Sequence, residues 1–161
     1  MRKYLPAFAF VAACLFGGAA HASNSCAIPS NAQALFGQID EELNRIRARH
    51  GRGALKYNAE LSRAATGHAC DMAVLDFFSH QGSNGSNVQN RARRAGYRDC
   101  LIAENIAHGN IYASPAAVLQ GWMDSQGHRR NMMHRRIVDY GIGIAVDHDG
   151  PYWVLVMAKG C

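Results

Sequence analysis

Residues Tyr152–Met157 read YWVLVM, and this run limits the possible folds of the chain more than any other stretch. Both faces of a strand formed here are apolar, so both faces must be covered by other parts of the protein. A second run, Tyr140–Val146, precedes it, and the segment Asp147–Pro151 between them has the composition of a turn. The two runs therefore predict a β-hairpin covered on both sides.

Four helices are predicted before this hairpin. The clearest spans about residues 31–50, where Leu35, Ile39, Leu43 and Ile46 recur at helical spacing. The other three span about 58–78, 87–95 and 114–125, and Asn58 and Ser114 are suitable capping residues for the first and the last of them. Helices combined with a doubly covered sheet predict an α/β fold in which the sheet lies between two helical layers.

The first 22 residues have the parts of a secretory signal peptide. Arg2 and Lys3 form a short basic region, Leu5–Leu15 is apolar, and Ala20–Ala22 is a small-x-small cleavage site. The apolar run is too short for a transmembrane helix, and no later stretch is long and apolar enough for one. We therefore divide the chain into a signal peptide (1–22), a short leader (23–34) and one domain (35–161).

A lipoprotein signal is the alternative interpretation of the same segment. Residues 11–14 read VAAC, which would leave Cys14 acylated and the protein anchored by a lipid. We favour ordinary secretion, because lipidation leaves the apolar residues 15–20 in the mature chain. The expected location is thus outside the cell or in the periplasm.

Four cysteines follow the signal segment, an even number that in an exported chain predicts two disulfides. Cys26 and Cys161 lie near the two ends of the mature chain, so we pair them with each other and Cys70 with Cys100. Three pairings are open to four cysteines. No cysteine pair has the spacing of a zinc finger.

Three segments place polar, ligand-capable side chains among apolar neighbours: 78–80 (FSH), 103–107 (AENIA) and 125–129 (SQGHR). Each lies at an element boundary or the end of a loop, where functional sites are common. Their spacing alone does not show that they meet, because the first and the last segment are far apart in the sequence. Within the second segment, we expect Asn105 to brace loop backbone.

Five motifs in order, FFSHQG, RRAGY, AENIAHG, GWMDSQGHRRNMM and YGIGIA, resemble the CAP superfamily. This family, also called the SCP domain, comprises cysteine-rich secretory proteins, antigen 5 and pathogenesis-related 1 proteins. The resemblance covers about residues 35–158 and is closest to the compact secreted bacterial branch. It implies a three-layer α-β-α sandwich with a central, mainly antiparallel sheet.

The resemblance also implies a cavity lined by His80, Glu104 and His128. In several members of the family the two histidines bind zinc or another divalent cation, and zinc is the cation we expect here. Many eukaryotic members have a second acidic residue three positions after the helix tryptophan, where this chain has Ser125. Asp124 is adjacent but lies about 100° away on a helix. The cavity-lining prediction is therefore His80, Glu104, Ser125 and His128, with the histidines as metal ligands.

These residues favour a binding module over an enzyme. Two imidazoles and a carboxylate can hold zinc and leave a position for water, but one carboxylate cannot easily serve as ligand, orienting group and base. The expected ligand is a small molecule, a lipid or a peptide, and we expect a monomer. The alternative is a metal-dependent hydrolase of the peptidase type with Glu104 as the candidate catalytic group.

A third interpretation starts from the basic residues around the last site segment. Arg129, Arg130, Arg135 and Arg136 could bind anionic lipid or a wall polymer of the cell envelope, together with Arg91, Arg93, Arg94 and Arg98. Nucleic acid is excluded as a partner, because no nucleic-acid-binding motif accompanies these charges and the chain is predicted to be exported.

Overall fold

The computed structural model describes residues 25–161. The predicted signal peptide, its cleavage site and Cys14 lie outside the described residues. The described chain contains these elements in order: α1 (Ala32–Arg49), β1 (Lys56–Tyr57), α2 (Ala59–Leu75), α3 (Val88–Arg94), β2 (Asp99–His108), the 3-10 helix η1 (Asn110–Tyr112), α4 (Pro115–Asp124), α5 (Gln126–Met132), β3 (Asp139–Asp147) and β4 (Gly150–Gly160).

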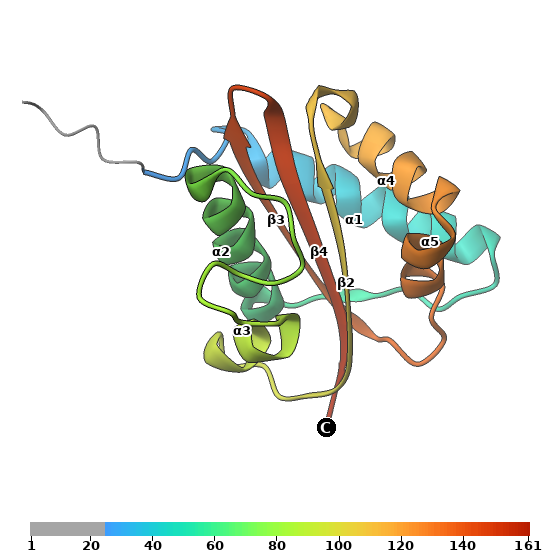
Figure 1. The fold of residues 1–161 in the computed structure, drawn as a ribbon. Coiled ribbons are helices and arrows are strands. Elements are labelled where there is room, and N and C mark those ends of the chain that lie inside the picture. The colour runs from blue at the N-terminus through green and yellow to red at the C-terminus, as the bar shows by residue number, and fades with distance from the viewer. Residues whose placement is uncertain (1–24) are drawn as a thin grey trace, which may run out of the picture.

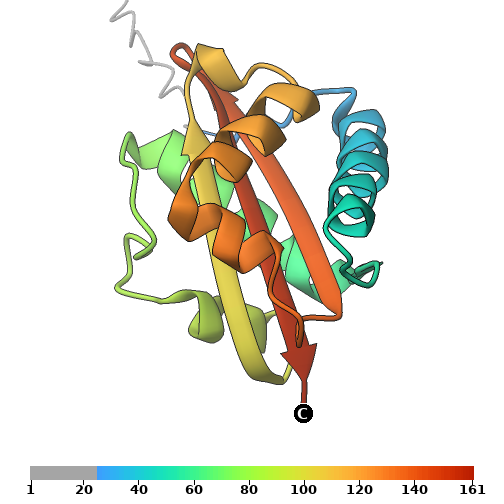
Figure 2. The same ribbon diagram turned by 90° about the vertical axis from the view of Figure 1, so that its right-hand side faces the viewer.

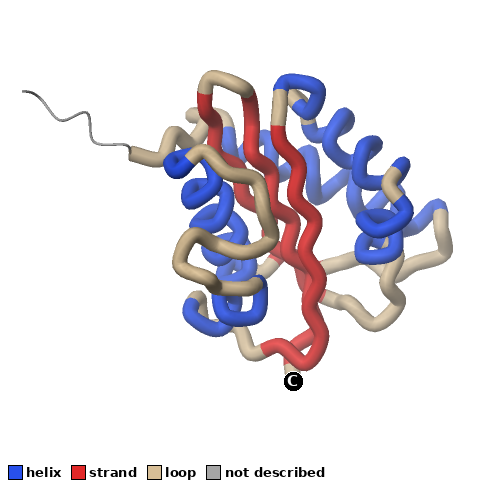
Figure 3. Tube along the Cα trace, viewed as in Figure 1, coloured by secondary structure: helices blue, strands red, loops and turns tan. Residues whose placement is uncertain are grey.

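The four strands form one sheet in the order β1-β3-β4-β2. The strands β3 and β4 form the predicted hairpin, β2 pairs antiparallel with β4, and only the short β1 pairs parallel, with β3. Figure 3 shows the strands side by side with helices on either side of them. The predicted sandwich with a mainly antiparallel sheet is confirmed. Within residues 25–161, no helix combines the length and the apolar character that crossing a bilayer requires.

Strand β4 shows why both of its faces are apolar. Trp153, Leu155 and Met157 point into one core cluster, which they share with α1, α4 and α5. Tyr152 and Val154 alternate with them and point into a second cluster with α2 and α3. Figures 1 and 2 show the two helical layers on opposite faces of the sheet. The period of two along the strand divides its side chains between two cores.

The helix α2 packs unusually close to β3. A Cβ atom at Gly141 or Gly143 would overlap the backbone of α2 at Ser62 or Thr66. The hydroxyl of Ser62 uses the short separation to donate to the carbonyl of Ile142 at 2.6 Å. Glycine is thus required here by the close approach of a helix and a strand.

The predicted caps form at the helix starts. The side chain of Asn58 accepts from the amide of Leu61, and that of Ser114 from the amide of Ala117. One boundary differs from the prediction. α2 ends at Leu75 instead of about Phe78, because Asp76 adopts a left-handed conformation with φ of 51° and closes the helix.

The predicted disulfide pairing is wrong. The bonds are Cys26–Cys70 and Cys100–Cys161. The reason lies in the sheet, where the start of β2 pairs with the end of β4 and so brings Cys161 beside Cys100. The leader in turn runs past α2, with Ala27 bridged to Val146 at the end of β3. Nearness to the chain ends therefore did not predict nearness in space.

Candidate functional site

His80 and Glu104 meet at the edge of the sheet. β2 is an edge strand, and Glu104 faces the α2–α3 layer as Ile106 does two residues later. His80 lies in the loop between α2 and α3, and its Nδ1 is 2.9 Å from Oε1 of Glu104. The carboxylate is almost fully buried, with 3% of its side chain exposed, whereas the His80 side chain is 58% exposed. Glu104 therefore orients a histidine that remains accessible to solvent.

Arg91 completes this arrangement from α3. Its Nη2 donates to Oε2 of Glu104 at 2.6 Å, and its Nη1 donates to the carbonyl of Ser86 at 2.8 Å. Both terminal nitrogens also reach the carbonyl of His80, at 3.1 and 3.2 Å. One guanidinium thus compensates the buried charge of Glu104 and holds the α2–α3 loop at two points, His80 and Ser86.

The position of Arg91 corrects its assignment to the exposed basic cluster. Its side chain is only 10% exposed. The sequence did indicate that Glu104 needs a positively charged partner, because a carboxylate inside an apolar run is costly to bury alone. It did not indicate which arginine would be that partner. Arg93, on the same helix, is instead 62% exposed and pairs with Asp99 at 3.4 Å.

His128 approaches from the other helical layer. It lies on α5, which the sequence analysis did not predict as a helix, and it is half-buried. Burial lowers the pKa of His128 below its ordinary value, and the neighbouring His80 lowers it further. His80 is therefore near enough to His128 to act on it electrostatically, and both effects favour the neutral form of the His128 imidazole.

Two buried amides position α5 against β2. Asn105 is fully buried and donates to the carbonyl of His128 at 3.1 Å. Asn131 donates to Oδ1 of Asn105 at 2.9 Å and to the backbone carbonyl of Glu104 at 3.3 Å. These bonds fix the helix that carries His128 to the strand that carries Glu104. Asn105 was expected to brace loop backbone; the backbone that it binds is instead that of α5.

Ser125 and Asp124 lie at the joint between α4 and α5. Ser125 is both the C-cap residue of α4 and the N-cap residue of α5. Its backbone is extended, and its side chain makes no capping hydrogen bond. Its role in the cavity stays a prediction. Asp124 accepts from Gln120 at 2.8 Å and lines a groove between α1 and α4.

His68, on α2, contacts the backbone next to His80. It is fully buried on α2, and its Nε2 lies 2.8 Å from the carbonyl of Ser79, beside His80. A carbonyl only accepts, so Nε2 carries the proton. Burial lowers the pKa of His68, the carboxylate of Glu104 acts in the opposite direction, and the nearby charge of Arg91 lowers the pKa further. His68 therefore fixes the start of the His80 loop as a neutral side chain.

The surroundings of His80 can be compared with those of a metal-binding histidine. The Nδ1 atom of His80 is hydrogen-bonded to Glu104, so the lone pair of Nε2 is available to a metal ion. Metal-binding histidines with a supporting carboxylate usually have this arrangement. Both oxygens of Glu104 are engaged, by His80 and by Arg91. Within residues 25–161, no group of three or more His, Cys, Asp or Glu side chains is placed to hold a metal ion. Ligation of a cation by His80 and His128 therefore stays a prediction, in which two imidazoles are the donors and Glu104 is their support.

The chain is similar to several known bacterial proteins. It is 32% identical over 107 residues to the uncharacterized membrane protein YlbC of Bacillus subtilis (strain 168), covering 66% of this chain and 30% of YlbC. An extracellular protein containing a SCP domain from Bacillus anthracis superposes with a TM-score of 0.69 at 27% identity, over 82% of this chain and 44% of that one.

A third similarity extends over a whole protein. An outer surface protein from Borrelia burgdorferi superposes with a TM-score of 0.75 over 85% of this chain and 99% of that one. The identity is 15%, so this match supports the fold alone. By contrast, the chain spans less than half the length of the two Bacillus proteins.

The match at the level of the family is direct. Residues 41–158 match the sequence model of the family described as the Cysteine-rich secretory protein family. The matched range contains both histidines, Glu104 and Arg91. It covers the helices except the first half of α1, and the sheet except the last two residues of β4. The chain belongs to the CAP family, the cysteine-rich secretory protein family.

Proposed function

We propose that the protein is an extracytoplasmic binding module whose His80 and His128 together take a divalent cation, zinc first. The observation that carries the proposal is the 2.9 Å contact between His80 Nδ1 and Glu104, which leaves Nε2 of an exposed histidine free. The lowered pKa of His128 supports it, because only neutral imidazole binds a metal.

Two features support a location outside the cytoplasm. The two disulfides are typical of oxidising compartments. The Bacillus anthracis relative is described as extracellular, and at 27% identity it is similar in sequence as well as in fold. We extend this location to the present chain as part of the proposal.

Binding is favoured over hydrolysis by the surroundings of Glu104. A general base must be within reach of the proton it removes. Both carboxylate oxygens of Glu104 already contact other side chains, and the carboxylate is buried. Ser125 stands where a second carboxylate would be needed. We therefore expect no chelator-sensitive turnover of a peptide library, and such turnover would support the hydrolase alternative instead.

Zinc titration by calorimetry tests the proposal directly. The oxidised protein should bind one zinc ion, and the double variant His80→Ala, His128→Ala should bind none. Binding should weaken at acidic pH, because protonated imidazole has no lone pair to donate. The matched control is His148→Ala, an exposed histidine on the β3–β4 turn, which should leave the affinity unchanged. Equal zinc binding by the double variant and the unmodified protein would sink the proposal.

A further inference from the structure

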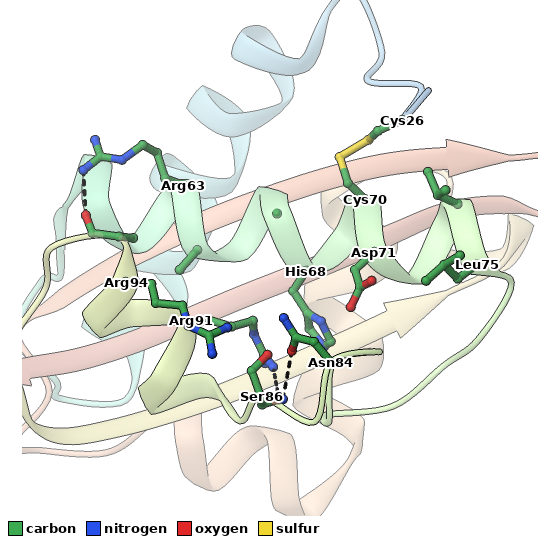
Figure 4. Close-up of a pocket in the computed structure, with 14 residues that line it drawn as sticks. Cys26, Arg63, His68, Cys70, Asp71, Leu75, Asn84, Ser86, Arg91 and Arg94 are labelled. Atoms are coloured by element: carbon green, nitrogen blue, oxygen red, sulfur yellow. Dashed lines mark hydrogen bonds between the residues drawn. A yellow bond between two sulfur atoms is a disulfide. The ribbon is translucent and has the colours of Figure 1, made fainter. Parts of the chain in front are cut away.

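A cavity lies between α2 and α3, away from the two histidines. Its volume is about 800 Å³, and none of His80, Glu104, Ser125 and His128 lines it. Figure 4 shows α2 along its length, with the disulfide Cys26–Cys70 on one side and, on the other, α3 and the loop that joins α2 to α3. We call this cavity the α2–α3 groove.

One end of the α2–α3 groove is positively charged. Arg63 on α2 and Arg94 on α3 line it and are exposed. Within the described chain, the ion pairs of α3 are those of Arg91 with Glu104 and of Arg93 with Asp99, so the charge of Arg94 is not compensated. Arg63 donates to a backbone carbonyl, that of Ala95, at 2.7 Å, and this bond does not cancel its charge.

The remaining charged groups of the groove leave part of this excess in place. Asp71 accepts from the amide and the hydroxyl of Ser83 at 2.8 and 2.6 Å and keeps its negative charge, which offsets one of the two exposed arginines and leaves the other in excess. His68 lines the groove too, and its lowered pKa keeps it neutral. Arg91 forms the inner wall with a buried Nε that has no hydrogen-bond partner among the described residues. The groove therefore attracts anions.

The other end of the groove is apolar. Val74 and Leu75, in the last turn of α2, line it, and Leu75 is 55% exposed. Ala64, Gly67 and the disulfide form the wall between the two ends. From Arg63 to Leu75 the helix rises about 18 Å. Figure 4 shows Arg63 and Arg94 at one end and Leu75 at the other. Charge and apolar surface are thus separated along one groove.

We propose that the α2–α3 groove binds an amphipathic organic anion. The anionic group lies between Arg63 and Arg94, and the apolar body extends along α2 towards Leu75. Guanidinium groups suit this role, because charge-assisted hydrogen bonds to carboxylate, sulfonate or phosphate oxygens are the stronger class of hydrogen bond. An apolar body adds the area-dependent free energy of leaving water. The proposal does not depend on cation binding at the two histidines.

The test uses the fluorescent anion 8-anilino-1-naphthalenesulfonate, which combines a sulfonate with an apolar body. The protein should bind it at one dominant site. Arg94→Gln should weaken binding about tenfold, since one charge-assisted bond contributes about 1.5 kcal/mol. Leu75→Ser should weaken it about fivefold through lost apolar contact. Arg136→Gln and Ile111→Ser, exposed residues outside the groove, are the matched controls and should have no effect.

Two comparison ligands test the anionic group and the apolar body separately. The uncharged N-phenyl-1-naphthylamine and inorganic sulfate should each bind at least about tenfold more weakly than the sulfonate, since each lacks one half of the recognised group. Unchanged sulfonate affinity in both groove variants overturns the proposal. So does displacement of the probe by sulfate at equal concentration, because that indicates a simple anion site. Circular dichroism and thermal unfolding of every variant exclude a loss of fold.

Discussion

At the scale of single residues, Arg91 organises the candidate site. It contacts Glu104, the carbonyl of His80 and the carbonyl of Ser86, so one side chain joins α3, β2 and the loop. Its partner Glu104 is 3% exposed, and a carboxylate so deeply buried is tolerated only when its charge is compensated. Arg91 is therefore a positioning residue for His80, and it need not contact a ligand itself.

Removing Arg91 should be costly. Arg91→Ala leaves Glu104 buried without its partner, and breaking such a pair costs about 3–5 kcal/mol of the free energy of unfolding. The matched control is Arg93→Ala, whose exposed pair with Asp99 contributes less than about 1 kcal/mol. Urea unfolding with intact disulfides measures both. Similar losses for the two variants would show that the Arg91–Glu104 pair has no special role.

At the scale of elements, helix α5 and strand β2 show the limits of local patterns. α5 has one buried residue, Met132, and therefore no apolar periodicity to predict it. Asn105 and Asn131 hold it in place through bonds to β2. α2 is the opposite case, because its apolar face and the Asn58 cap were both visible in the sequence. What the sequence did not show is how closely α2 approaches β3.

Gly143 makes this close approach testable. In Gly143→Ala the new Cβ meets the backbone of α2 at Thr66, which cannot move as a side chain would. We expect a loss of about 1–3 kcal/mol in the free energy of unfolding, as for overpacked cores. The control is Gly67→Ala on α2, where no atom lies within 4 Å of the added carbon. It should stabilise the protein by up to about 1 kcal/mol. Equal effects in chemical denaturation would contradict the packing argument.

At the scale of the whole molecule, the two disulfides attach the ends of the described chain to its layers. Cys26–Cys70 ties the leader to α2, and Cys100–Cys161 ties the end of β4 to the start of β2. The bonds close loops with sequence separations of 44 and 61 residues. In the chain-entropy account, each such loop contributes roughly 4 kcal/mol by restricting the unfolded chain.

Peptide mapping without reduction checks this connectivity. Trypsin should release residues 99–129 linked to the C-terminal dipeptide Gly160–Cys161, and residues 64–91 linked to the peptide that contains Cys26. Both linked masses should disappear after reduction. A linked mass that joins Cys26 to Cys161 would instead restore the pairing expected from the sequence.

The double variant Cys100→Ser, Cys161→Ser should lose roughly 4 kcal/mol of the free energy of unfolding.

The sequence by itself determined the features that depend on neighbouring residues. Helix caps, the β3–β4 hairpin and the two apolar faces of β4 are set by spacing and turn chemistry over a few positions, so they could be predicted. The ordered motifs also led to His80, Glu104 and His128. Only the tertiary structure decided which arginine partners Glu104, which cysteines pair and that α5 is a helix. These outcomes depend on which faces meet across the sheet, and contacts between segments far apart in the chain leave no local pattern to read.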